Sequence, residues 1–246
     1  MVAPLWAIAP FILVGALLYS SVGHGGATVY LAILTLAGFA VAPLATTVQV
    51  LNVIAASIAF LHFRFAGHLR PKLLLSFIIT SVPAAYAGGR YPFSDRAAGI
   101  LLAVVLLVAA ARFLFFARPP SIHVPQTVAW RYVGAPILGA VLGFAAGATG
   151  IGGGIFLSPI LLMIGWCTMQ EAGAIASAFI VLNSLAGLAA KLPSTPLDGR
   201  VLAVLGAAVL VGALIGAYVG ARKLPARSLQ VLLGCVLVVA GVKALI

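Results

Sequence analysis

The chain has 246 residues, of which 64% are hydrophobic and only 7% are charged, and this composition excludes an ordinary soluble domain. Several stretches approach the roughly 20 apolar residues that a transmembrane helix needs. The net charge is +11, but the basic residues lie singly between apolar segments, which excludes a nucleic-acid-binding surface and indicates topology signals and lipid contacts. We therefore expect an all-α, multi-pass protein of the cell (inner or plasma) membrane.

The first half of the chain is predicted to hold five apolar segments. The second of them is too short to cross a bilayer, because a helix over residues 27–38 extends only roughly 18 Å and the hydrocarbon core is about 30 Å thick. A glycine-rich break at Gly23-His24-Gly25-Gly26 precedes it. No Lys or Arg precedes Arg64, so no cleavable signal peptide is predicted. The segments cover residues 4–22, 27–38, 43–63, 71–89 and 97–117.

The second half repeats this arrangement after a proline-containing linker at residues 118–131. Its short segment again follows a glycine cluster, Gly147–Gly154. Each glycine in that cluster costs a helix about 1 kcal/mol relative to alanine, so a break is expected. Loose backbone at membrane depth is tolerated only where it is buried in protein or lines a wet cavity. The segments cover residues 132–147, 154–165, 171–191, 201–221 and 228–246.

An internal repeat relates the two halves. Gly23-His24-Gly25-Gly26 aligns with Gly150-Ile151-Gly152-Gly153, Val50-Leu51-Asn52 with Val181-Leu182-Asn183, and Ala85-Tyr86 with Ala217-Tyr218. The chain is therefore predicted to consist of an N-terminal repeat (1–117), a cytoplasmic linker (118–131) and a C-terminal repeat (132–246). If each short segment turns back at its break, the chain changes direction an odd number of times per half. The two repeats are then inverted with respect to the membrane.

The basic residues divide unevenly between the two predicted sides. One side collects Arg64, Arg70, Lys72, Arg112, Arg118, Arg131, Arg222, Lys223 and Arg227, and the other collects Arg90, Arg96, Lys191, Arg200 and Lys243. The larger group marks the cytoplasmic side by the positive-inside rule. This places the linker in the cytoplasm and both termini outside.

Paired short helices in inverted repeats are the sequence feature that best indicates a transporter's substrate site. A helix that starts inside the membrane presents free N–H groups and the positive end of its dipole, which favour an anion. None of the three acidic residues, Asp95, Glu171 and Asp198, is predicted to lie deep in a span, which argues against a bound cation. The predicted substrate-binding residues are Gly23, His24, Gly25, Gly26, Thr28, Asn52, Thr149, Gly150, Gly152, Gly153, Gly154 and Asn183.

Each of these residues also has a structural interpretation. Glycines permit close helix packing, and Asn52 and Asn183 can form interhelical hydrogen bonds. His24 and Glu171 are candidates for coupling to protons, yet His24 also suits a structural role and Glu171 suits a helix start. No metal or cofactor motif is present. Protons or another coupling ion, and a second copy of the chain, stay open as partners beside a small anion and the lipid bilayer.

At these residues the chain resembles the sulfite exporter TauE/SafE family, a group of bacterial, archaeal and plant permeases. The resemblance rests on the two glycine clusters, on Ile155–Leu161 after the second, on Glu171-Ala172 with Ser177, and on the two-half layout. It implies transport of sulfite, sulfoacetate, thiosulfate or related anions across the cytoplasmic membrane. Two positions depart from the pattern: Ala32 stands opposite Pro159, and His24 stands where a small or apolar residue is usual.

The sequence thus predicts a secondary transporter, a permease or exporter, that binds a small organosulfur anion or sulfite near the membrane midplane. A passive anion channel is the nearest alternative. A membrane-embedded enzyme is the alternative from another class, but it needs a cluster of catalytic side chains at one depth. The four histidines and three acidic residues are dispersed and do not form such a cluster. We therefore do not expect an enzyme.

Overall fold

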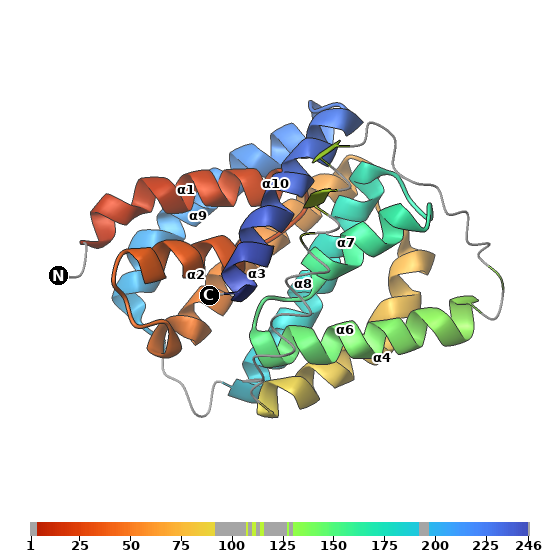
Figure 1. Ribbon diagram of the computed structural model, residues 1–246, viewed down its shortest axis with the longest axis horizontal. Helices are drawn as coiled ribbons and strands as arrows, with labels where there is room; N and C mark the ends of the chain where they lie inside the picture. Colours follow the sequence, from red (N-terminus) through yellow and green to blue (C-terminus); the bar gives the residue numbers. More distant parts are fainter. Residues whose placement is uncertain are drawn as a thin grey trace.

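The computed structural model describes residues 4–91, 107, 110–111, 114–115, 127, 130–191 and 197–245 (Figure 1). These residues form helices and turns, and no strand occurs among them. The helices are α1 (Leu5–Ser21), α2 (Ala27–Leu36), α3 (Val41–Phe65), α4 (Pro71–Arg90), the short π-helix η1 (Trp130–Gly134), α6 (Ala135–Thr149), α7 (Gly154–Met163), α8 (Met169–Lys191), α9 (Gly199–Arg222) and α10 (Ala226–Leu245). The predicted segment 97–117 and the linker 118–131 lie almost entirely outside the described residues.

Five helices in the described part of the chain are long and apolar enough to cross a membrane. They are Leu44–Phe65, Pro71–Arg90, Tyr132–Thr149, Met169–Lys191 and Gly199–Arg222. The helices after the two glycine breaks, α2 and α7, have 10 residues each and are too short to cross alone. The protein is therefore an all-helical, multi-pass membrane protein with two short helices, as predicted.

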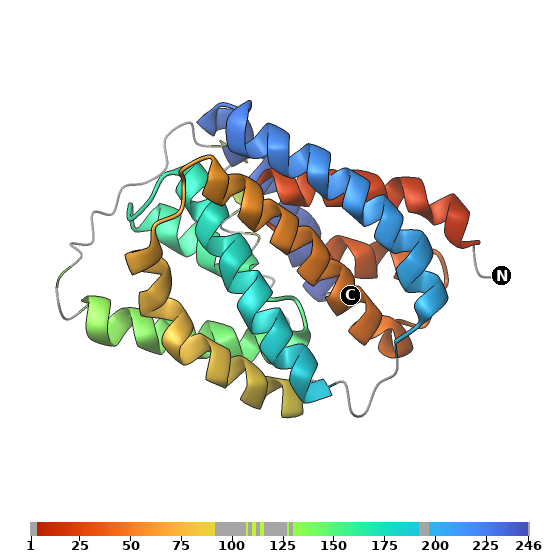
Figure 2. The same ribbon diagram turned by 180° about the vertical axis from the view of Figure 1, so that it is seen from behind.

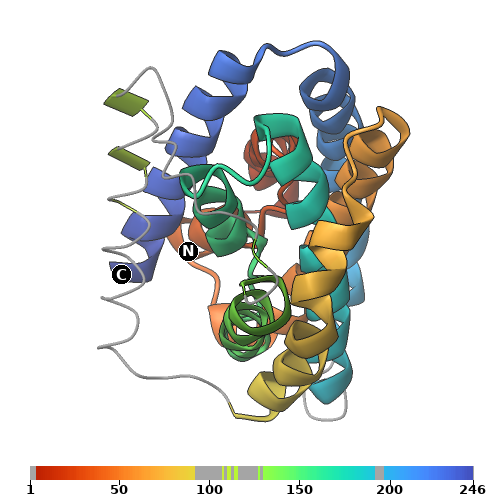
Figure 3. The same ribbon diagram turned by 90° about the vertical axis from the view of Figure 1, so that its right-hand side faces the viewer.

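Four of the long helices lie side by side, in the order α9, α3, α8 and α4 (Figure 2). The outer helices α1 and α6 pack on one side of this layer and are seen nearly end-on in Figure 3. Each outer helix packs mainly against a helix of the other half, α1 against α9 and α6 against α4. Exchanging the halves converts one of these pairs into the other. This pairing is expected of two related repeats, while their inversion stays a prediction.

Glycines at every fourth position allow both outer pairs to pack closely. In α9, Gly212, Gly216 and Gly220 face backbone carbonyls of α1, and in α6, Gly139, Gly143 and Gly147 face those of α4. A Cβ at any of these positions would collide with a carbonyl oxygen. Gly147 therefore serves helix packing, and α6 continues through it to Thr149. The second break is shorter than the predicted cluster and begins at Gly150.

Contacts between helix ends show which polar residues share a side of the molecule. Arg70, at the start of α4, lies 3.8 Å from Glu171, near the start of α8. A ring nitrogen of His68 lies 3.0 Å from the carbonyl oxygen of Ala221, near the end of α9. Lys191 lies at the opposite end of α8. These contacts agree with the predicted separation of Arg70 and Arg222 from Lys191.

Candidate functional site

The first glycine break connects α1 to α2 and is completely buried. Its residues from Val22 to Gly26 are all in the buried class. Gly26 caps α2 with φ = +109°, a conformation that residues with a Cβ rarely adopt. Gly23 packs directly against the backbone of Gly173 in α8. Neighbouring helices therefore seal this break in the structure.

The second glycine break connects α6 to α7 and is only partly buried. Gly153 caps α7 with φ = +71°, the same left-handed arrangement as at Gly26. Gly152–Gly154 are buried against α8, whereas Thr149, Gly150 and Ile151 are partly exposed. The Thr149 hydroxyl donates to the carbonyl oxygen of Ala145 at 2.7 Å, so it closes the end of α6. One half of this break therefore faces inward and the other reaches the surface.

Asn52 of α3 joins the two breaks through its side-chain amide. Its Oδ1 accepts a hydrogen bond from the backbone N–H of Ala27 at 3.0 Å, which satisfies the first free donor of α2. Its Nδ2 donates to Ser184 Oγ at 3.2 Å. A Cβ on Gly152 would lie 2.6 Å from that same Ser184 oxygen. Asn52 is thus at the predicted site, although its Oδ1 occupies the backbone N–H of Ala27, a donor that an anion would need.

Asn183 does not mirror Asn52 in the structure. Its Nδ2 donates to the carbonyl oxygen of Phe179 at 2.8 Å, within α8 itself. Its Oδ1 is buried without a hydrogen-bond partner in the described part of the chain. The position opposite Asn52 is taken instead by Ser184, which is not among the predicted site residues. A shift of one residue along a helix, about 100°, separates the two side chains.

His24 links the first break to the short helix of the second half. Its Nδ1 lies 3.1 Å from the carbonyl oxygen of Val22, and its Nε2 lies 3.4 Å from Ser158 Oγ in α7. Since a carbonyl only accepts, the contact with Val22 indicates a proton on Nδ1. His24 is completely enclosed, with 1% of its surface exposed. It therefore bridges the two halves at the level of the breaks.

A small cavity of about 10 Å³ lies among these groups. Its polar lining comes from Tyr19, His24, Thr28 and Asn52, and its apolar lining from Ile151, Ile155 and Ile180. The Thr28 hydroxyl donates to the Tyr19 hydroxyl at 2.9 Å. This volume suits about one water molecule. The structure thus brings Gly25, Gly26, Thr28, His24 and Asn52 together in a closed arrangement.

Lys191, which is partly exposed, and Gln49, which is buried, lie beside Gly150 at the second break, and neither was predicted as a site residue. Lys191 Nζ donates to the carbonyl oxygen of Ala148 at 3.3 Å. Gln49 Nε2 donates to the carbonyl oxygen of Ser184 at 3.0 Å. A Cβ on Gly150 would lie 3.4 Å from Gln49 Oε1 and 3.7 Å from Lys191 Nζ. The sequence signal for Lys191 is a lysine at the end of a span, and this signal by itself predicts only topology.

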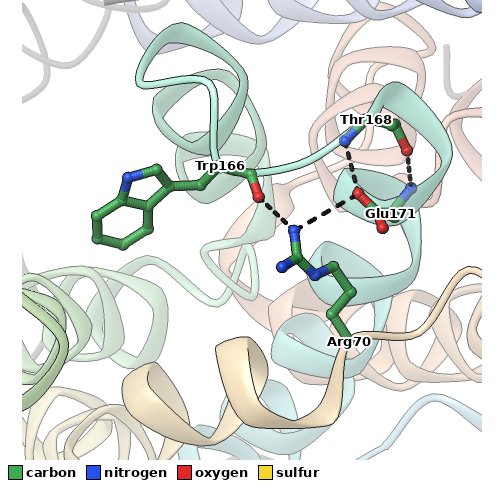
Figure 4. A network of polar contacts seen from close by, with 4 residues as sticks. All are labelled: Arg70, Trp166, Thr168 and Glu171. Atoms are coloured by element: carbon green, nitrogen blue, oxygen red, sulfur yellow. Dashed lines mark hydrogen bonds and ion pairs between the residues drawn. The ribbon is translucent and has the colours of Figure 1, made fainter. Parts of the chain in front are cut away.

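Glu171 lies apart from this cluster, in a polar network at the other end of α8 (Figure 4). Its carboxylate accepts from the Thr168 N–H at 2.8 Å, and Thr168 Oγ1 accepts from the Glu171 N–H at 3.3 Å, which is a capping box. Arg70 donates to the Trp166 carbonyl oxygen at 2.6 Å and lies 3.8 Å from the carboxylate. Burial raises the pKa of the neighbouring Cys167 thiol to about 12, so it stays protonated. The network caps the start of α8, and the coupling role of Glu171 stays a prediction.

A larger cavity, about 480 Å³, lies beside this network. Arg70, Lys72, Ser76 and Trp166 line it, with apolar walls from Leu69 and Leu73. Trp166 follows the C-terminal end of α7, whereas the glycine break precedes its N-terminal end. The two sites are therefore separated by the length of α7, about 15 Å. This cavity does not include any predicted site residue.

Comparisons with known proteins agree with this architecture. The family model described as sulfite exporter TauE/SafE matches residues 8–244. A probable membrane transporter protein, y4hK of Sinorhizobium fredii, is 34% identical over 242 residues, which is 97% of this chain and 96% of that protein. No solved structure matches the chain. The family and the relative are membrane transporters and not enzymes, and over nearly its whole length the chain belongs to the sulfite exporter TauE/SafE family.

Proposed function

We propose that this membrane transporter carries a small oxyanion, of which sulfite is the first candidate, by a secondary transport mechanism. The anion binds between the two glycine breaks, near the middle of the membrane. The observation that carries the proposal is the convergence of two glycine-capped helix starts, one from each half, on one buried polar cavity. No carboxylate is present among the described residues that line this cavity.

The electrostatics of the cavity favour an anion. The N-terminal ends of α2 and α7 each carry a partial positive charge, and their field is strong where water is excluded. The hydroxyls of Tyr19, Thr28 and Ser158 also lie around the breaks. Each now donates to a protein oxygen and becomes available to an anion only when that bond breaks. The family description names sulfite, a small oxyanion that accepts hydrogen bonds through its oxygens.

The closed cavity supports a carrier over a passive channel. Space for about one water molecule does not admit sulfite, so substrate binding requires the halves to move apart. Contacts such as His24 with Ser158 and Asn52 with Ser184 cross between the halves and break when this happens. Rocking of one inverted repeat against the other then opens the site to alternate sides. The linker 118–131 faces the cytoplasm in this scheme.

Uptake into proteoliposomes tests the proposal. Purified protein is reconstituted and supplied with ³⁵S-labelled sulfite, thiosulfate, sulfoacetate or sulfate, with protein-free vesicles as the control. We expect at least one of these anions to enter, and to enter faster when unlabelled anion is present inside, because exchange is a property of carriers. Uptake without such trans-stimulation supports a channel, and no uptake of any anion contradicts the proposed substrate class.

A further inference from the structure

A continuous line of polar groups connects the exposed side of the second break with the central cavity. Lys191 and Gln49 stand beside Gly150. Gln49 then bonds the backbone of Ser184, and the Ser184 hydroxyl accepts from Asn52. Asn52 Oδ1 accepts a hydrogen bond from the N–H of Ala27, and Ala27 lines the cavity. This line runs along the contact between α3 and α8 at the centre of the molecule.

Lys191 gives this line a positive charge at its outer end. Its side chain is partly buried, and its ammonium lies beside the partly exposed Gly150. An amide nitrogen carries two hydrogens, and Gln49 uses one of them for Ser184. The first half has no cation at the matching place, because the residue that precedes Lys191 by 131 positions is Phe60. The charge therefore belongs to one side of the transporter only.

The second break, which has the lysine charge beside it, is also the more exposed of the two breaks. The first break is buried throughout, whereas the second is exposed at Thr149, Gly150 and Ile151. In this conformation an anion reaches the second break before it reaches the cavity. A lysine at the mouth of a low-dielectric site attracts anions and raises their local concentration.

We propose that Lys191 and Gln49 form an outer binding station, where a small oxyanion is held before it passes to the cavity between the breaks. The inference rests on the proposed function and names the residues that capture the substrate on one side of the membrane. The ammonium supplies charge-assisted hydrogen bonds to the anion. Gln49 is the buried, inner member of this station, and α3 carries both Gln49 and the deeper amide of Asn52.

Two substitutions of Lys191 separate its charge from its structural contact. Lys191→Gln removes the charge but keeps a donor for the Ala148 carbonyl oxygen, and Lys191→Arg keeps the charge. In proteoliposomes supplied with ³⁵S-labelled sulfite, we expect Lys191→Gln to raise KM about tenfold with kcat within about twofold. We expect Lys191→Arg to stay near wild type. High ionic strength is expected to reduce the difference in KM between Lys191→Gln and wild type, since exposed charges are screened.

Gln49→Glu is the second variant, and it tests the station without changing Lys191. A carboxylate at this position neutralises the ammonium and repels an anion, so we expect a similar rise in KM from the same side of the vesicle. An unchanged KM in Lys191→Gln and Gln49→Glu, with intact wild-type uptake, would overturn this inference alone. An equal loss in Lys191→Gln and Lys191→Arg would also overturn it, because geometry would then matter and not charge. If wild-type protein moves none of the anions, the proposed function fails and this inference fails with it.

Discussion

The two glycine breaks have similar backbones but different surroundings. Both end in a glycine with positive φ that caps a 10-residue helix. The first is enclosed and joined to its neighbours by Asn52, His24 and Tyr30, whose hydroxyl donates to the Gly25 carbonyl oxygen at 2.7 Å. The second is partly exposed. A duplicated motif therefore fixes the geometry of two helix starts, while the residues around each start decide which one is accessible.

The same contrast assigns different tasks to the two halves. Buried amide, imidazole and hydroxyl groups at the first break are held by hydrogen bonds within the protein, so they become available to an anion only after the halves move apart. Lys191, which has no charged counterpart in the first half, gives the second break an entrance. A transporter that alternates between sides needs one closed and one accessible path at a time, and the observed asymmetry is of this kind.

The largest effect is expected from Gly153→Val. Gly153 has the left-handed cap conformation that both breaks adopt at the start of their short helices. A β-branched side chain at φ = +71° is strained, and its Cβ would lie 2.9 Å from the Cβ of Ala146. We expect sulfite uptake to be abolished while the protein still inserts into the membrane. Gly199→Val is the matched control, because nothing lies within 4 Å of a Cβ at Gly199. Normal uptake by Gly153→Val would remove the second break from the mechanism.

A pair of alanine substitutions compares the sealed break with the accessible one. At Gly25 a Cβ would collide with the Asn52 side chain and with its carbonyl oxygen at 2.6 Å, so Asn52 must leave Ala27. At Gly150 a Cβ meets only ordinary contacts, and the positive φ costs about 1 kcal/mol. We expect more than tenfold loss of uptake for Gly25→Ala and about twofold for Gly150→Ala. An equal loss of uptake in both variants would show that the residues around each break do not affect transport.

The amides of the two halves are expected to differ as well. Asn52→Ala leaves the buried N–H of Ala27 unsatisfied, which costs about 1–3 kcal/mol, and removes a donor near the cavity. Asn183→Ala breaks a hydrogen bond within α8 and removes an acceptor that has no partner among the described residues. We expect sulfite affinity to fall roughly tenfold in the first variant and by about twofold in the second. Titration calorimetry of the purified variants measures both sulfite affinities. Identical affinities in the two variants would contradict the placement of Asn52, and not Asn183, at the anion site.

The smallest effect is expected at Glu171. Glutamine also completes a capping box, so Glu171→Gln preserves the start of α8 and loses only a partly exposed ion pair worth about 0–1 kcal/mol. We expect uptake and its pH dependence to match wild type. A lost response to a proton gradient would instead give Glu171 a coupling role. Arg70→Gln controls for the ion pair, since it removes the same contact and keeps the carboxylate.

Much of the architecture is readable from the sequence, because apolar length and glycine position are local signals. The short helices α2 and α7 and the boundaries of the long spans follow from them. The extent of the second break does not follow from local signals, since Gly147 is recognisable as a packing residue only when α4 lies beside it. The hydrogen-bond partner of Asn52, which is Ser184, does not follow from the repeat either, because the residue aligned with Asn52 is Asn183. The repeat offset changes from 127 residues at the breaks to 132 at Ser184, and an error of one residue turns a side chain to another face of the helix.

The central claim is that both glycine breaks hold one small oxyanion between them. A structure of the protein with selenite, a heavier analogue of sulfite with a strong anomalous signal, tests it most directly. We expect one selenium peak within hydrogen-bonding reach of His24, Ser158 and the start of α2, in a cavity wider than the present one. A peak confined to the cavity of Arg70 and Lys72, with none between the breaks, would contradict the account.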